Sequence, residues 1–403
     1  MPSNKANWTR EASPRVVRLL HDALVAGFRL ERRIDPYFRA TFDRLLQKPI
    51  AALAQAVINA RRPHMHLALA EERLLDDEEE ITRAIIEHMA AFMRREYAHT
   101  RAERAGNTKT YGVVRGEFTV LPALRREVRH GVFGAEATYR AWVRFGGPGP
   151  FAPPDLDDNG ILSIGVKLMG VPGEKLFDDE RYTQDFTGIS APTFTTPNIV
   201  ENLKLQRRVF DGTPLFYFIN PFDSHLMDGL MQGLYSKTHV NPLEVQYYSC
   251  VPYLLGEDQA MQYSLRPKAP GTTKMPKHPS DDYLRDAMVA TLRRQSVEFD
   301  FLVQVQTDPH RMPVEDASVQ WPERLSPFVP VARLRIPAQE FASEDQLAFA
   351  DNLSFNPWHS LPEHRPLGNQ NRARRAIYLE LSKLRQEMNG SRRIEPTGDE
   401  AFA

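Results

Sequence analysis

The chain has 403 residues, of which 42% are hydrophobic and 26% are charged, and its formal net charge at pH 7 is −1. This length allows two or three packed units with a large core, and the near-zero charge gives no bulk electrostatic case for binding nucleic acid. The single cysteine, Cys250, excludes an intrachain disulfide and is expected to be a buried thiol. We see no stretch with the length of a membrane span and no secretory pattern at the start, so we expect a cytoplasmic protein.

The first hundred residues predict a helical extension, because apolar residues recur with helical spacing from Pro14 to about Tyr97. One apolar stripe comprises Val16, Leu19, Leu20, Leu24 and Phe28. A second comprises Phe42, Leu45, Leu46, Ile50, Leu53 and Val57. Such stripes normally bury in a core, so we expect them to pack helix on helix in a cap rather than to face a membrane or a partner.

After about residue 100 the pattern changes to short segments rich in β-branched and aromatic residues. These predict strands at 112–120, 138–145, 161–168, 191–196, 243–251, 260–265, 298–305 and 331–336. Helical insertions are predicted at 198–210, 223–237 and 280–293. Regularly spaced strands with such excursions favour a closed antiparallel barrel over βαβ units.

The predicted fold class is therefore α+β, an antiparallel β-barrel with a helical N-terminal extension and C-terminal helices. We divide the chain into a helical extension at 1–100, a barrel domain at 101–345, a helical C-terminal segment at 346–390 and a flexible tail at 391–403. The 31 prolines fit a large loop-rich, strand-bearing portion.

The segment 371–385 contains no Gly or Pro and predicts a helix. At about 100° per residue, Arg374, Tyr378 and Arg385 fall on one narrow stripe at the edge of the apolar face. A cation one turn away and, above all, a bound ferric ion would favour the phenolate form of Tyr378, and Tyr is one of the side chains that hold haem iron. The alternative is a tyrosine that packs its ring in the core and leaves its hydroxyl in water.

Between about residues 104 and 385, dispersed motifs resemble those of the catalases and their catalase-like haem relatives, in the same order. Arg374-x-x-x-Tyr378 is similar to the segment in which the Tyr binds haem iron and the Arg supports its phenolate. The stretch 353–357, which contains Phe355, is similar to the Phe-Ser-Pro stretch that precedes it, and segments 158–167 and 188–194 are similar to two strands of the family. The resemblance also places Arg104, Arg144 and Arg385 against the haem propionates. It therefore implies haem b as the cofactor, and a homo-oligomer, since relatives form dimers or tetramers.

The departures from the family bear on activity. The distal His of the family corresponds to Asn107 and its distal Asn to Ser190, while Tyr111 either faces the pocket or packs outward as a strand residue. Neither Asn nor Ser accepts a proton near neutral pH, so the resemblance implies no fast catalase turnover. The leading hypothesis is an enzyme that rearranges, dehydrates or reduces a small-molecule substrate, either an organic hydroperoxide, such as a lipid hydroperoxide, or another O–O or N–O compound. A non-catalytic haem-binding or ligand-sensing protein is the second hypothesis, and a scaffold without haem is the third.

None of the 12 histidines has a partner at the spacing of a zinc helix, so none is assigned as a metal ligand. We expect His64, His66, His359 and His364 to be surface or structural residues.

Overall fold

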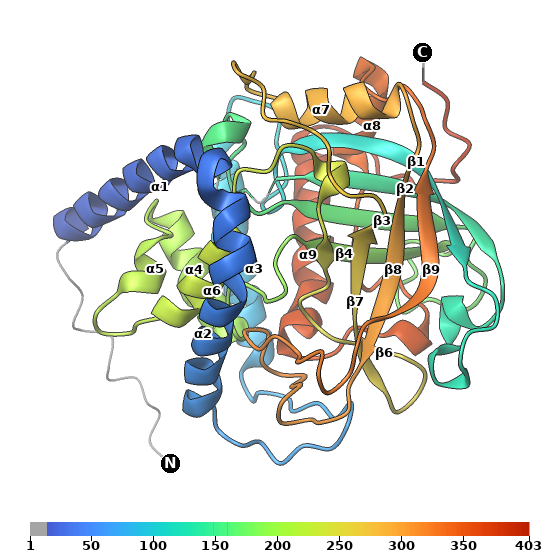
Figure 1. Cartoon of the computed structure of the whole chain (residues 1–403), viewed down its shortest axis with the longest axis horizontal. Coiled ribbons are helices and arrows are strands. Elements are labelled where there is room, and N and C mark those ends of the chain that lie inside the picture. The colour runs from blue at the N-terminus through green and yellow to red at the C-terminus, as the bar shows by residue number, and fades with distance from the viewer. Residues whose placement is uncertain (1–13, 148, 159, 403) are drawn as a thin grey trace.

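A computed structural model describes residues 14–147, 149–158 and 160–402. At its centre is an antiparallel β-barrel, shown in Figure 1. The strands are β1 (Thr110–Val120), β2 (Thr138–Gly146), β3 (Ser163–Met169), β4 (Thr183–Ile189), β5 (Tyr247–Tyr248), β6 (Tyr253–Leu254), β7 (Ala260–Pro267), β8 (Val297–Val305) and β9 (Val329–Ile336). They follow the order β5-β4-β3-β2-β1-β9-β8-β7-β6, and pairing of β5 with β7 closes eight of them into a barrel.

The barrel interior is filled by the inward-facing residues of the alternating strands. Aromatic rings dominate this core: Phe186 and Phe301 have ring centroids 4.9 Å apart, and Phe118 and Tyr263 lie 5.2 Å from Phe301. All four side chains are fully buried. A closed barrel leaves no long unpaired edge, which explains why strands as short as β5 suffice to complete it.

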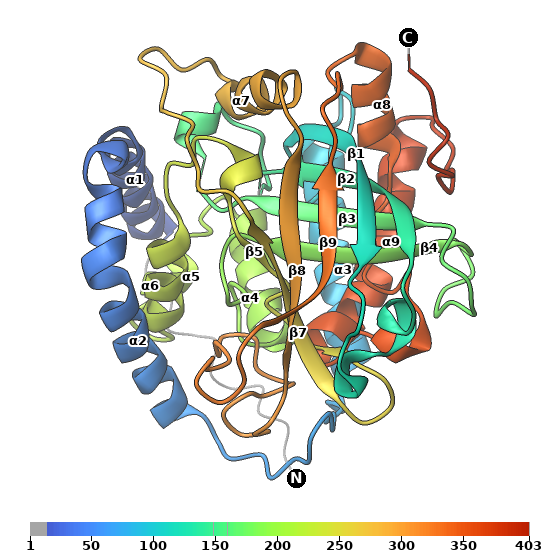
Figure 2. The same cartoon turned by 45° about the vertical axis from the view of Figure 1, so that its right-hand side comes forward.

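Helices cover the outside of the barrel. They are α1 (Pro14–Phe42), α2 (Lys48–Arg61), α3 (Glu78–Glu96), α4 (Ile199–Phe210), α5 (Phe216–Ile219), α6 (Leu226–Tyr235), α7 (Tyr283–Leu292), α8 (Glu344–Asn352) and α9 (Asn369–Met388), with a π-helical turn at Asp43–Gln47. Short 3-10 turns occupy Arg126–Val128, Gly131–Phe133, Asp155–Asp157, Pro242–Glu244 and Pro362–His364. Helices α3 and α9 share an apolar cluster that includes Ile85, Ile377 and Leu384, and Figure 2 shows both helices behind strands β1–β4. No helix among the described residues is both long enough and apolar enough to cross a bilayer.

The predicted barrel and most of its strands and inserted helices are confirmed, but two predicted strands are wrong. Residues 191–196 form no strand, because Pro192 has no backbone N–H to donate to a β-ladder. The strand of this region is β4, just before them, which a hydrophobic pattern misses because β4 carries polar residues. The predicted strand 243–251 contains a 3-10 turn and only the two residues of β5. The segment after α9 also differs from the frayed tail that we expected: Arg393 pairs with Asp179 at 2.7 Å, and the carboxylate of Glu400 accepts a hydrogen bond from the Trp142 indole at 2.8 Å.

The prediction that the apolar stripe of the first helix packs in a cap is wrong. Leu19 and Leu20 on α1 are exposed. The second stripe is divided: Leu45 and Leu53 are exposed, but Phe42 and Ile50 pack in a cluster that α2 forms with α6. The side of α1 that faces the protein is instead charged, and it includes Arg32, Asp35 and Arg39. This orientation is the reverse of that of an ordinary surface helix.

Candidate functional site

Four strands end together at one edge of the barrel, and the predicted distal residues lie there. Thr110, Gly146, Ser163 and Ile189 pair in sequence across β1, β2, β3 and β4. Asn107 precedes the first of these strands and Ser190 follows the last. The barrel therefore brings two residues that are 83 positions apart to the same edge of the sheet.

Asn107 and Ser190 each make a structural contact at this edge. The backbone of Asn107 has a positive φ of 50°, a conformation that Asn tolerates better than most residues, and its carbonyl accepts a hydrogen bond from Arg144 at 2.8 Å. The Ser190 hydroxyl oxygen is buried and accepts a hydrogen bond from the Leu162 amide at 2.9 Å. The hydroxyl proton of Ser190 is thereby free to be donated to another acceptor.

Tyr111 does not join this pair. Its ring is fully buried in the barrel core, and burial is the main reason why the pKa of its phenol is raised well above the usual value. The prediction that it faces a ligand pocket is therefore not supported by its position inside the barrel.

Three arginines gather beside the same edge. The guanidinium of Arg104 donates to the carbonyl of Leu353 at 2.6 Å, and that of Arg385 donates to the same carbonyl at 3.1 Å. Arg144, on β2, donates to the Thr110 hydroxyl at 2.8 Å as well as to Asn107. The three side chains that the resemblance assigned to the haem propionates therefore lie near one another, and their role stays a prediction.

The surroundings of the three arginines are unfavourable for positive charge. Burial lowers the pKa of Arg104 to about 10. Burial, followed by the charges of Arg104 and Arg385, holds the pKa of Arg144 well below its usual value, and burial together with Arg104 does the same for Arg385. Since a guanidinium stays protonated in proteins, these shifts report an electrostatic cost rather than deprotonation.

No carboxylate among the described residues forms an ion pair with any of the three. Asp351, which acts on all three electrostatically, pairs instead with Arg101 at 3.9 Å. Arg372, which lies on α9 with Arg385, differs from the three arginines because it does form ion pairs: with Glu72 at 2.7 Å, Glu78 at 2.6 Å and Glu315 at 2.9 Å. The three-arginine cluster (Arg104, Arg144 and Arg385), of which Arg144 and Arg385 are buried and Arg104 is partly buried, is thus a cationic site that a multiply charged anion would complement.

On helix α9, Tyr378 lies between Arg374 and Arg385, the member of the three-arginine cluster that α9 contributes. The Arg374 guanidinium lies 5.5 Å from the centroid of the Tyr378 ring and 5.2 Å from that of Phe194, four residues after Ser190. Arg374 and Arg385 are eleven residues apart, or about 16 Å along the helix. The described residues offer the half-buried Tyr378 hydroxyl no hydrogen-bond partner.

The segment 353–358 runs along α9 and separates part of the helix from the barrel. The Asn356 amide donates to the carbonyl of Arg375 at 3.3 Å, and the Trp358 indole donates to the carbonyl of Asn371 at 2.7 Å. Phe355 lies against β3, where a Cβ added at Gly165 would come within 2.8 Å of its ring. Glycine at this position is what allows Phe355 to pack on the strand.

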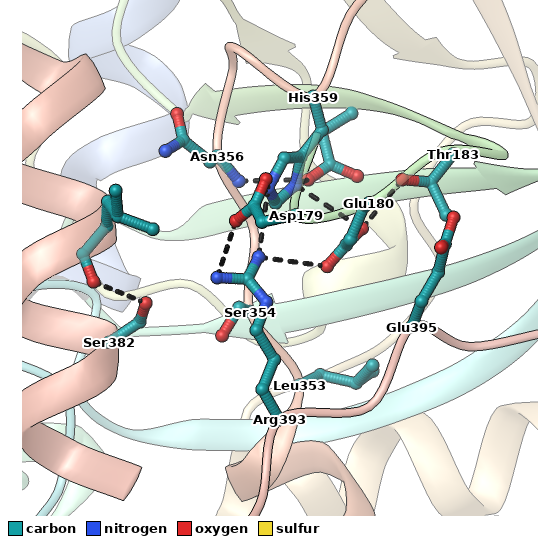
Figure 3. Close-up of polar contacts among 12 residues, drawn as sticks. Asp179, Glu180, Thr183, Leu353, Ser354, Asn356, His359, Ser382, Arg393 and Glu395 are labelled. Atoms are coloured by element: carbon teal, nitrogen blue, oxygen red, sulfur yellow. Dashed lines mark hydrogen bonds and ion pairs between the residues drawn. The ribbon is translucent and has the colours of Figure 1, made fainter. Parts of the chain in front are cut away.

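A second polar cluster, missed by the sequence reasoning, lies next to Phe355. Lys167 of β3 is fully buried, pairs with Asp185 at 2.7 Å and also contacts Glu180. Burial acts to lower the pKa of Lys167, but the two carboxylates outweigh it and the pKa is raised. Figure 3 shows Glu180 beside His359, which lies 2.8 Å from Asp185. Glu180, Asp185 and His359 have the spacing of metal ligands, but the Lys167 ammonium contacts both carboxylates and supplies their counter-charge.

The predicted histidine roles can now be located. His359 and His364 are fully buried, and the Val132 amide donates to the His364 ring at 3.0 Å, so both are structural. His64 is exposed and stacks on His310 with ring centroids 4.2 Å apart. Cys250 is buried as expected; burial raises the pKa of its thiol to about 12, and the thiol donates to the Ala191 carbonyl at 2.9 Å.

Comparison with known proteins shows a structural likeness. No family model matches the sequence, and no curated protein matches it. A bacterial catalase superposes with a TM-score of 0.53 at 15% identity over 83% of this chain and 67% of that one. A fungal catalase gives a TM-score of 0.54 at 15% identity over 81% and 66%, and catalase A from Saccharomyces cerevisiae gives 0.54 at 14% identity over 81% and 68%.

The chain therefore has a catalase-like fold, with an eight-stranded antiparallel barrel, a long N-terminal helix and C-terminal helices. It spans about two thirds of the length of these catalases. At such low identity the likeness shows the fold alone.

Proposed function

We propose that this chain binds haem b between α9 and the ends of strands β1–β4, where Tyr378 would hold the iron, and that it acts on an organic hydroperoxide. The observation that carries the proposal is the three-arginine cluster, in which Arg144 and Arg385 are buried and Arg104 is partly buried, and which forms no carboxylate ion pair among the described residues. Haem propionates are carboxylates, and the planar fork of Arg binds a carboxylate through two parallel hydrogen bonds. The fit is supported by the catalase-like fold and by the position of Tyr378 on the same helix as Arg385.

Arg374 and Tyr378 would form the proximal side. The guanidinium of Arg374 lies over the Tyr378 ring, 5.5 Å from its centroid. A bound ferric ion would itself favour the phenolate form of the tyrosine that holds it. Bound haem would supply the iron centre at which an O–O bond is activated, and Phe355 would help to enclose it.

Asn107 and Ser190 would form the distal side. The Ser190 hydroxyl can donate a hydrogen bond to a bound substrate because its oxygen is already held by the Leu162 amide. The Asn107 side chain can donate or accept but cannot take up a proton near neutral pH. Decomposition of hydrogen peroxide benefits from a base that moves a proton between the two oxygens, so we propose reduction, dehydration or isomerisation of an organic hydroperoxide, such as a lipid hydroperoxide, rather than efficient catalase activity.

A non-catalytic haem-binding or ligand-sensing protein is the second candidate. It is favoured by the same distal residues, because the Asn107 carbonyl and the Ser190 oxygen are both used in structural hydrogen bonds. The two candidates differ in turnover and not in haem binding.

The test begins with the absorption spectrum of the full chain expressed with a haem supply, where a Soret band of high-spin ferric haem bound by tyrosinate is expected. Tyr378→Phe should lose the phenolate signature in resonance Raman spectra. The matched control is Tyr97→Phe, a tyrosine packed on the same α3–α9 cluster, which should keep that signature. Turnover is then measured with hydrogen peroxide, cumene hydroperoxide and a fatty-acid hydroperoxide. Full haem loading without turnover on any of the three would favour the binding protein, and absence of a Soret band would reject both candidates.

A further inference from the structure

Helix α1 presents a continuous apolar stripe to solvent. Leu19, Leu20, Leu30, Ile34, Tyr37 and Phe38 are all exposed, with Leu19 at 69% and Tyr37 at 90% of their full accessibility. At about 100° per residue the six side chains fall within about 100° of arc on one side of the helix. Single exposed apolar residues are normal, but an aligned set of this length marks an interaction surface.

The opposite side of α1 holds the helix to the protein through polar contacts. The Asp35 carboxylate, fully buried, accepts a hydrogen bond from the Thr238 amide at 2.6 Å. The Arg39 guanidinium donates to the Ser236 carbonyl at 3.2 Å and to Asp43 at 2.7 Å. These buried charges fix the rotation of the helix, so the apolar stripe cannot turn inward without breaking them.

The charges around the stripe have one predominant sign. Arg15 and Arg29 follow one edge of it and are exposed, Arg33 on the same edge is exposed but pairs with Asp157 at 3.3 Å, and Arg44 lies just beyond the end of α1. Asp22 is the only acidic side chain that is exposed between residues 14 and 48. An apolar stripe edged by arginines is the pattern of a helix that lies in the plane of an anionic lipid surface.

We propose that α1 docks this protein on an anionic lipid surface, with its apolar stripe buried at the boundary between headgroups and acyl chains. A second copy of the chain fits the stripe less well. In an antiparallel pair of α1 helices related by a two-fold axis, the same edge of each helix meets, which brings the arginine-bearing edges together. Those like charges repel each other but are attracted to phosphatidylglycerol or another anionic headgroup.

Co-sedimentation of the purified full chain with vesicles tests the proposal. We expect binding to phosphatidylcholine vesicles that contain about a quarter phosphatidylglycerol, little binding to phosphatidylcholine alone, and several-fold weaker binding when salt is raised from about 0.1 M to about 0.5 M. Leu30→Ser combined with Ile34→Ser should reduce binding at least about tenfold, because both side chains would leave the apolar phase. Leu74→Ser combined with Ile394→Ser removes two equally exposed apolar residues outside α1 and should leave binding unchanged.

All these substitutions lie on the surface, so the melting temperatures should match that of the wild type. Charge reversal by Arg29→Glu and Arg44→Glu should abolish the preference for anionic vesicles. The proposal is overturned if the wild type stays in the supernatant with anionic vesicles at low salt, or if it binds neutral and anionic vesicles equally. It is also overturned if light scattering shows a dimer that Leu30→Ser with Ile34→Ser converts to a monomer, since the stripe would then be covered by a second copy.

Discussion

Replacing Arg385 by methionine should leave the haem-free protein as stable as before while weakening haem binding. Arg385 donates one hydrogen bond of ordinary length, 3.1 Å to the Leu353 carbonyl, and loss of such a charge-assisted bond costs about 1.5–3 kcal/mol. Because Arg104 donates to the same oxygen at 2.6 Å, the two terminal nitrogens lie within about 6 Å, where like charges repel by about 2–3 kcal/mol at an effective dielectric constant of about 20. The two contributions nearly cancel in the haem-free protein.

In the haem-bound protein the substitution has no such compensation. One propionate loses a charge-assisted partner worth about 1.5–3 kcal/mol, so the Kd for haem should rise about ten- to hundredfold. Haem affinity is measured by Soret titration of the haem-free chain, and stability by thermal unfolding of the same preparation.

Arg372→Met is the matched control for Arg385→Met, because both arginines are on α9. Removing Arg372 leaves Glu72, Glu78 and Glu315 without their shared cation, which costs about 3 kcal/mol. For a chain of this size that corresponds to a fall in melting temperature of about 3–4 °C, with haem affinity unchanged. The reasoning is refuted if Arg385→Met lowers the melting temperature of the haem-free chain as much as Arg372→Met does and leaves the haem Kd unchanged.

Three further predictions follow from other contacts. Asn107→His should raise hydrogen peroxide turnover per haem at least about tenfold by restoring a general base; a variant that loads haem without any gain would show that the distal side lies elsewhere. His225→Gln should flatten the pH dependence of the melting temperature. Burial lowers the pKa of His225, but its hydrogen bonds to Asp228 and Glu201 raise it to about 9, so its contribution to stability is full below about pH 6.5 and is lost as pH rises through 9. Lys167→Met should lower the melting temperature by several degrees because it removes the buried ammonium that pairs with both Asp185 and Glu180, and an unchanged melting temperature would show that His359 and Arg393 suffice as their partners.

The barrel could be predicted from the sequence because strands such as β1 and β8 bury apolar residues in a regular pattern between turns. β4 was missed because Thr183 and Asp185, on its outer face, are buried by contacts with Glu180, Lys167 and the His359 segment. Their polarity looks like that of a loop until the partners are known. A hydrophobic pattern reports burial against apolar neighbours and not burial inside an ion network.

The prediction for the apolar stripe of α1 was wrong because its inward side is charged and its apolar side faces solvent. Periodicity in the sequence shows that Leu19, Leu30 and Ile34 share a face, but not whether the protein or something outside it covers that face. The buried Asp35 and Arg39 decide the question, and their partners at 234–238 are about two hundred residues away. In an amphipathic helix, the charged side can therefore be the one that faces the protein, provided that backbone groups of another segment bind its charges, as those of Ser236 and Thr238 do here.

The four arginines of α9 differ in their surroundings, and these surroundings say more about function than the residue type does. Arg372, Arg374, Arg375 and Arg385 are equivalent by composition and lie on one helix. The fold gives Arg372 three carboxylates, places Arg375 over Phe177 and Trp358, and sets Arg374 over Tyr378. Arg385 donates only to carbonyl oxygens, and the charges of Arg104, Arg393 and Arg101 outnumber that of Asp351 around it. Because repulsion from Arg104 offsets the hydrogen bond of Arg385, the position brings little net stability, and a dianionic ligand is a partner that would complement the charge.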